Sequence, residues 1–67
     1  MLKNNLSKIM GEKRLKIYEL EKLSNISRST LTRLYYNRAN AINFNTLENL
    51  CRALDCSPSD ILEILPE

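Results

Sequence analysis

The residues most able to do chemistry in this 67-residue chain lie between positions 24 and 40, a segment that contains no acid. Residues spaced i, i+1, i+4, i+5 and i+8 share one side of a helix. In this segment those positions are Arg28, Ser29, Thr32, Arg33 and Tyr36. Leu31 and Leu34, with Ile26 just before them, form an apolar stripe on the opposite side. The spacing therefore predicts a helix over 28–36 with one buried face and one face of positive charge and hydrogen-bond donors.

Such a face suits the major groove of duplex DNA. An α-helix fits this groove, and guanine presents two acceptors to the fork of an arginine side chain. Ser27 is a good N-cap, and a helix N-terminus favours phosphate. Single-stranded nucleic acid usually needs an aromatic platform, but Tyr35 and Tyr36 diverge by about 100° on a helix, which weakens that reading. Three polar residues follow the helix, where a second phosphate strand could pass: Asn37, Arg38 and Asn40.

The charge of the chain is sorted along its length. Residues 22–47 carry four basic side chains and no acid, whereas residues 48–67 carry Arg52 against five acids, within a net charge of +2. If the basic part occupies one surface, that surface attracts a polyanion. Arginines that merely keep a small domain soluble give the same asymmetry, so charge alone leaves both interpretations open.

Composition disfavours several other functions. The chain has no histidine, which excludes Ser-His and Cys-His pairs, and we expect no enzyme activity. Two cysteines, Cys51 and Cys56, cannot alone complete a four-ligand zinc site, so we expect reduced thiols, no metal and no cofactor. No apolar run approaches the ~18 residues that span a bilayer, and the N-terminus has no signal-peptide pattern. We expect a cytoplasmic protein without a membrane partner, and no small-molecule ligand is implied.

Five short helices account for the apolar spacing, which predicts an all-α fold and a single domain over 1–67. They are expected near 5–14, 17–24, 28–36, 45–54 and 58–65. The first should bury Leu6, Ile9 and Met10, and the second Ile17, Leu20 and either Leu23 or Ser24. Asn25 should make the turn between the second and third helices, because asparagine tolerates the left-handed conformation.

Two further helix starts are predicted from capping patterns. In Asn45-Thr46-Leu47-Glu48, Asn45 is expected to cap the fourth helix and Glu48 to reach back. Ile42 and Phe44 are expected to anchor the preceding loop to the core. Ser57-Pro58-Ser59-Asp60 is expected to start the fifth helix, which should bury Ile61, Leu62 and Leu65 and end at Pro66.

The segment LEKLSNISRSTLTRL, residues 20–34, matches a helix-turn-helix. Together with the five helices and the ending TLENLCRALDCSPSDILEILP, it resembles the phage-repressor/Cro-type, XRE-like family over nearly the whole chain. The resemblance implies a compact lambda-repressor-like domain that binds double-stranded DNA. By position, it implies base contacts from Ser27, Arg28, Ser29, Thr32 and Arg33. It implies phosphate contacts from Lys16, Thr30, Tyr36, Asn37, Arg38 and Asn40, although Thr30 could instead be structural.

Three positions depart from the family pattern. Glu21 stands where the family usually has a small residue between the two helices, so it must bend outward or find a partner. Asn25 replaces a turn glycine, which it should tolerate. Ile17 replaces a glutamine that holds a phosphate, and Lys16 is expected to compensate by its charge alone.

The function expected from these observations is sequence-specific duplex DNA binding by a small transcriptional regulator, with repression by promoter occlusion as the default mechanism. The family generally binds as a two-fold dimer on two half-sites, so a homodimer on DNA is expected. The segment 61–66 is a candidate interface, although its apolar residues could pack internally. The alternative is a protein-interaction module or antitoxin-like adaptor whose acidic C-terminal half is the working surface.

Overall fold

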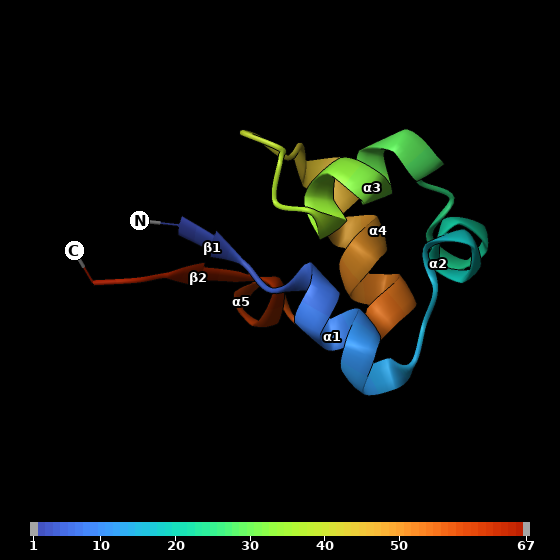
Figure 1. Cartoon of the computed structure of the whole chain (residues 1–67), viewed down its shortest axis with the longest axis horizontal. Coiled ribbons are helices and arrows are strands. Elements are labelled where there is room, and N and C mark those ends of the chain that lie inside the picture. Colours follow the sequence, from blue (N-terminus) through green and yellow to red (C-terminus); the bar gives the residue numbers. More distant parts are fainter. Residues whose placement is uncertain (1, 67) are drawn as a thin grey trace.

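Five helices and one short β-ribbon make up the computed structural model, which describes residues 2–66 (Figure 1). The helices are α1 (Leu6–Lys13), α2 (Ile17–Ser24), α3 (Arg28–Tyr35), α4 (Phe44–Leu54) and α5 (Pro58–Ile61). The strands are β1 (Leu2–Asn4) and β2 (Leu62–Ile64). The predicted all-α class with five helices is confirmed, and the first three helices lie within one residue of their expected bounds at each end. None of the helices within 2–66 is long and apolar enough to cross a membrane.

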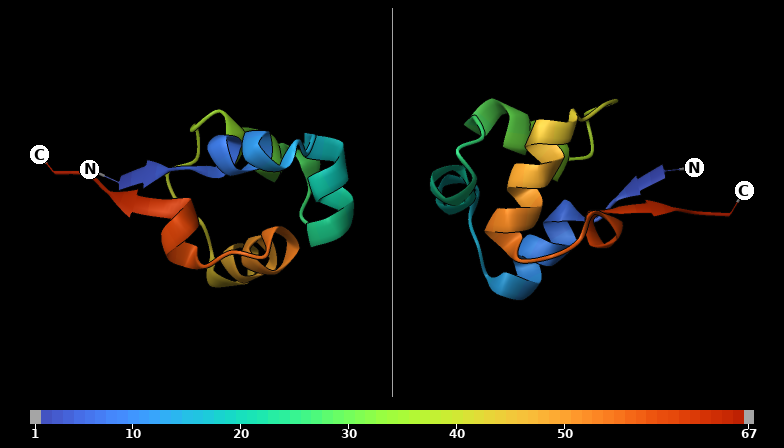
Figure 2. Two further views of the ribbon diagram at one scale, coloured as in Figure 1. Left: turned by 90° about the horizontal axis from the view of Figure 1, so that it is seen from below. Right: turned by 180° about the vertical axis from the view of Figure 1, so that it is seen from behind.

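The core lies between α1 and α3 on one side and α4 on the other (Figure 2). All five helices contribute to it, which is how a chain of this size excludes water from a continuous cluster. α2 packs against both α3 and α4, so the helix-turn-helix is held from behind by α4. The fully buried side chains are Leu6, Met10, Leu20, Leu31, Leu50, Leu54 and Ile61.

The turn between α2 and α3 has the predicted conformation. Asn25 is left-handed, with φ 59°, and its backbone N–H donates to the Glu21 carbonyl over 3.0 Å. Of the two candidates for the inward position before this turn, Ser24 is buried and Leu23 is 60% exposed. The Ser24 hydroxyl donates to the Leu20 carbonyl at 2.6 Å and accepts from the Ile26 backbone N–H at 3.3 Å. A buried serine therefore ties the end of α2 to the chain that leads into α3.

The predicted start of α4 is wrong. The helix begins at Phe44, and the Asn43 side chain, not that of Asn45, caps it by accepting from the Thr46 backbone N–H at 2.7 Å. With Asn43 as the cap, Phe44 becomes the first helical residue and points outward, 88% exposed. The expected anchoring of Phe44 in the core is therefore also wrong, whereas Ile42 does pack against the core.

The predicted length of the fifth helix is wrong as well. Ser57-Pro58-Ser59-Asp60 does start α5, and the Asp60 carboxylate accepts from the Ser57 backbone N–H at 3.0 Å. The helix ends at Ile61, however, because the next residues pair with the N-terminal segment as an antiparallel ribbon. The register places Leu2 opposite Ile64, Lys3 opposite Glu63, and Asn4 opposite Leu62.

The ribbon projects away from the helices, and the molecule measures 36 × 21 × 19 Å (Figure 1). The base of the ribbon is attached to the helices by two hydrogen bonds, one from Asn5 and one from Asn4. The Asn5 backbone N–H donates to the Ile61 carbonyl at 2.7 Å, and the Asn4 side chain donates to the Leu34 carbonyl at 2.7 Å. The second contact links the ribbon directly to the C-terminal end of α3.

Candidate nucleic-acid interface

The N-terminus of α3 is organised by a cluster of hydroxyl groups. Ser27 is the N-cap, as predicted: its Oγ accepts from the Thr30 backbone N–H at 3.3 Å. The same hydroxyl donates to Thr30 Oγ1 at 2.9 Å and lies 3.3 Å from Ser29 Oγ. Thr30 is half-buried, and both its backbone N–H and its hydroxyl are bonded to the cap residue. This arrangement gives Thr30 a structural part, whatever its contact with DNA.

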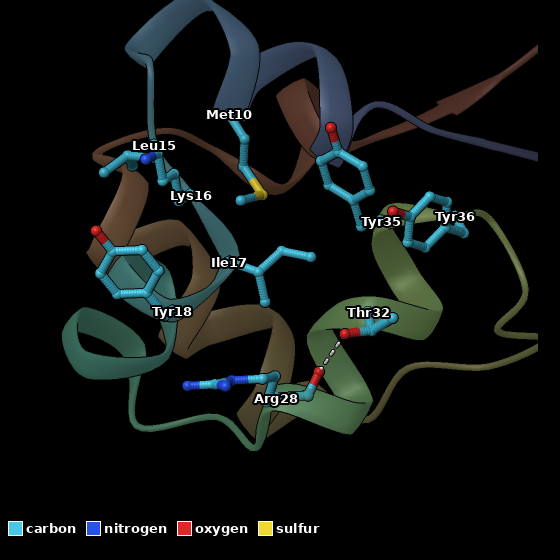
Figure 3. Close-up of a pocket in the computed structure, with 9 residues that line it drawn as sticks. All are labelled: Met10, Leu15, Lys16, Ile17, Tyr18, Arg28, Thr32, Tyr35 and Tyr36. Carbon is cyan, nitrogen blue, oxygen red and sulfur yellow. Dashed lines mark hydrogen bonds between the residues drawn. The ribbon is translucent and has the colours of Figure 1, made fainter.

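The two faces of α3 are those predicted from the spacing. Leu31 and Leu34 are buried, whereas Arg28, Ser29 and Arg33 are exposed. Thr32 is half-buried, and its hydroxyl donates to the Arg28 carbonyl at 2.7 Å (Figure 3). This bond leaves the hydroxyl oxygen as an acceptor.

Glu21 lies against the N-terminus of α3 and forms an ion pair with Arg28. Its Oε1 is 3.0 Å from Arg28 Nη2, and its Oε2 accepts from the Arg28 backbone N–H at 3.1 Å. The glutamate that departs from the family pattern therefore has a partner, and this partner is a predicted base-contacting residue. The sequence pattern did not reveal the pair, because the acid lies seven residues earlier on another helix.

Arg33 is the second arginine on the exposed face of α3. Its side chain is exposed, and the ion pairs found within residues 2–66 are Arg28–Glu21 and Arg52–Glu48. No carboxylate in that part of the chain competes for the Arg33 guanidinium. Its full set of donors is therefore available to an external acceptor.

The first residues after α3 are hydrogen-bonded to the end of that helix. Asn37 is left-handed, with φ 57°, and its backbone N–H donates to the Leu34 carbonyl at 3.1 Å. The Arg38 backbone N–H donates to the Arg33 carbonyl at 2.7 Å, which completes a Schellman-type helix end. The Arg38 guanidinium carbon lies 5.6 Å from the centre of the Tyr36 ring. Tyr36, Asn37, Arg38 and Asn40 are all exposed, so these phosphate candidates present their side chains to solvent.

An open groove of about 430 Å³ separates the start of α2 from α3 (Figure 3). It brings Lys16 at the N-terminus of α2 together with three predicted DNA-contacting residues of the α3 region. Ile17 lies between them and offers only apolar surface (Figure 3). The residues that line the groove are Met10, Leu15, Lys16, Ile17, Tyr18, Arg28, Thr32, Tyr35 and Tyr36.

Tyr18 and Tyr35 belong to this groove but were not among the predicted site residues. Tyr35 is half-buried, and its ring meets that of Tyr36 edge-on, with the ring centres 5.0 Å apart. Tyr18 is exposed at the first turn of α2, two residues after Lys16. An exposed aromatic residue close to a basic one at a helix start was the signal that could have identified it.

The cysteines take no part in this surface. Cys51 and Cys56 are free and half-buried. The pKa of the Cys56 thiol is raised by burial and by the neighbouring Cys51 thiol, which lowers the fraction of reactive thiolate. No cluster of three or more histidine, cysteine or acidic side chains suited to a metal ion occurs in residues 2–66.

Comparison with known proteins agrees with this geometry. The model of the Cro/C1-type helix-turn-helix DNA-binding domain matches residues 5–67, which include every residue of the surface described above. The chain belongs to this family. Double-stranded DNA is thus the partner of this Cro/C1-type domain, and its α2 and α3 are the helix-turn-helix.

A relative in Bacillus subtilis (strain 168) is described as an uncharacterized HTH-type transcriptional regulator, YozG. It is 36% identical to this Cro/C1-type chain over 59 residues, which cover 88% of this chain and 70% of YozG. The similarity therefore extends well beyond the helix-turn-helix itself.

Proposed function

We propose that this chain is a transcriptional regulator that recognises a specific duplex sequence by inserting α3 into the major groove. The observation that carries the proposal is the exposed face of α3, where Arg28, Ser29 and Arg33 stand on a helix whose opposite face is buried. The name of the relative YozG as a transcriptional regulator supports the regulatory role. We propose repression by occupying a promoter, because this mechanism needs only DNA binding and no contact with polymerase. The protein would act in the cytoplasm, where the DNA lies.

In this proposal the residues divide into base and phosphate contacts. The first turns of α3 approach the base edges through Ser27, Arg28, Ser29, Thr32 and Arg33. The flanks hold the two phosphate strands through Lys16 on one side and the loop after α3 on the other, with Thr30 near the helix N-terminus. The flanking residues, which would set register and not sequence, are Lys16, Thr30, Tyr36, Asn37, Arg38 and Asn40.

We further propose that the protein binds DNA as a homodimer through the β1–β2 ribbon. One recognition helix reads only a few base pairs, and a two-fold dimer doubles the site. Leu2 and Ile64 are opposite each other in the ribbon and are 61% and 82% exposed. Of the expected interface segment 61–66, Ile61 is fully buried and belongs to the core, so Ile64 is the residue that carries the proposal.

The experiment that tests the proposed function is selection of binding sites from random duplex DNA at near-physiological salt. Enrichment of a two-fold symmetric motif is the expected result, and its spacing would give the geometry of the dimer. A short asymmetric motif would retain specific binding but overturn the homodimer. Salt-sensitive binding without enrichment would overturn sequence-specific regulation.

A further inference from the structure

Within residues 2–66, Glu21 is the one acid that forms an ion pair or a hydrogen bond with a residue proposed to read bases. Its side chain is 35% exposed, at the boundary between α2 and the N-terminus of α3. A carboxylate at this place repels phosphate, because it opposes the attraction that a helix N-terminus normally offers to anions. A domain that binds DNA only through general attraction would gain affinity by losing this acid. Its presence therefore calls for a role other than affinity.

The contacts of Glu21 define what it does to Arg28. One carboxylate oxygen takes the backbone N–H of Arg28 at 3.1 Å, and the other takes Nη2 at 3.0 Å. Both the base of the side chain and its charged end are thereby attached to α2. Figure 3 shows the Arg28 side chain extended from α3 along the rim of the groove, with its guanidinium away from Thr32.

The ion pair does not exhaust the donors of Arg28. A guanidinium has five N–H donors in a fixed plane, and the Glu21 contact uses one of them. The remaining donors still offer the two-pronged arrangement that matches guanine O6 and N7. The side chain of Arg28 is 64% exposed in the ion pair, so an external acceptor can reach it.

We propose that Glu21 is a specificity-determining residue that holds Arg28 for a base edge and keeps it from the phosphate backbone. An arginine that moves freely beside DNA can form an ion pair with any phosphate, and such a contact carries no sequence information. The Glu21 carboxylate disfavours contact between Arg28 and a phosphate, because it repels phosphate at the α3 N-terminus. It also restricts the Arg28 side chain before binding, so less conformational entropy is lost when the arginine contacts a base. This inference rests on the proposed function, since it requires α3 to read bases.

The test is a double-mutant cycle of Glu21→Ala and Arg28→Ala, with base preference measured at each position of the selected site. Arg28→Ala should lower the preference at one position by roughly five- to 150-fold, the range for one bidentate contact. Glu21→Ala should lower the preference at the same position by at least about fivefold, the lower end of that range. It should also bind random-sequence DNA more tightly, with a salt dependence steeper by about one phosphate contact. In the Arg28→Ala background, Glu21→Ala should change no base preference.

Two further variants separate positioning from general effects. Glu12→Ala removes the same charge from an exposed position on α1, and it should leave all base preferences unchanged. Glu21→Gln keeps an acceptor for the Arg28 backbone N–H but loses the ion pair, so it should reproduce the loss of preference with a normally folded protein. Thermal unfolding of each variant monitors the fold.

The outcomes distinguish this inference from the proposed function. If the wild type selects a motif and Glu21→Ala and Glu21→Gln keep its base preferences, Glu21 has no part in specificity and the inference is overturned. An equal loss for all sequences, or a loss that persists without Arg28, would overturn it too. If the wild type selects no motif at all, the proposed function fails first.

Discussion

The Arg38 guanidinium lies 5.6 Å from the centre of the Tyr36 ring, just beyond the C-terminal end of α3. This contact places a cation beside the helix that is proposed to enter the major groove, at a distance typical of a cation–π interaction. The Arg38 backbone N–H also donates to the Arg33 carbonyl at 2.7 Å, so the backbone of Arg38 is attached to the end of α3. An exposed cation at this end of the helix is suited to contact a phosphate.

Arg38→Ala should therefore weaken binding to all duplex sequences by a similar factor. The slope of log affinity against log salt should fall by about one, as expected for one lost phosphate contact. The matched control is Arg52→Ala, which removes the same charge from α4, where the arginine already pairs with Glu48. An unchanged slope in Arg38→Ala would show that Arg38 touches no phosphate.

Arg33→Ala, unlike Arg38→Ala, should weaken binding to the preferred site more than binding to other sequences. Its guanidinium is exposed and has no carboxylate partner within residues 2–66. The variant should lose roughly 1–3 kcal/mol on the preferred site and relax the preference at one base position. Competition binding with single-base variants of the selected site measures this. A uniform loss over all of them would assign Arg33 to the backbone instead.

Ile64→Lys should prevent pairing of two copies through the ribbon. Ile64 is 82% exposed and makes little contribution to the core, so the fold should be retained. Binding to a single half-site should persist, whereas binding to the full two-fold site should weaken at least about tenfold. Leu23→Lys is the control, since Leu23 is also exposed but lies on α2. Cooperative binding by Ile64→Lys would mean that the copies meet elsewhere.

Asp55→Gly should stabilise the protein. Asp55 ends α4 in the left-handed conformation, with φ 52°, which disfavours residues with a Cβ. Its carboxylate also faces the negative end of the helix dipole. We expect a gain of about 0.5–1 kcal/mol in the free energy of unfolding, measured by urea denaturation.

Arg14→Gly provides the comparison for that prediction. Arg14 ends α1 with a similar φ of 56°, but its charge is favourable at a helix C-terminus. The gain there should be smaller than at Asp55. Equal gains at both positions would show that backbone strain alone matters and that the dipole contributes nothing.

Ser24→Ala should destabilise the helix-turn-helix. The substitution removes the acceptor of the Ile26 backbone N–H in a buried place, which costs about 1–3 kcal/mol. The exposed Ser7 of α1 offers a control, since Ser7→Ala should change the unfolding free energy little. A Ser24→Ala variant as stable as the wild type would mean that the N–H finds another acceptor.

Local features of the fold were predictable from the sequence, and features set by distant segments were less so. The caps at Ser27 and Ser57 and the turn at Asn25 were found, because each depends on residues a few positions apart. The predicted cap of α4 lay two residues too late, because the Asn45–Glu48 spacing matches a capping box, whereas Asn43 caps the helix in the structure. An asparagine side chain can cap a helix from either position, so the choice depends on how the preceding loop packs. In the structure Ile42 packs against the core, Asn43 is the cap and Phe44 is exposed.

In the candidate site, too, some features follow from local sequence and others from the packing of distant segments. Helical spacing alone determined the two faces of α3, because the positions of side chains around a helix follow from its period. The tertiary structure decided that Glu21, an acid outside the acid-free segment, meets Arg28 at the edge of the basic face. It also decided that residues at the two ends of the chain pair as a ribbon and shorten α5 to four residues. Both depend on how separate elements pack in space, which the period of a single helix does not contain.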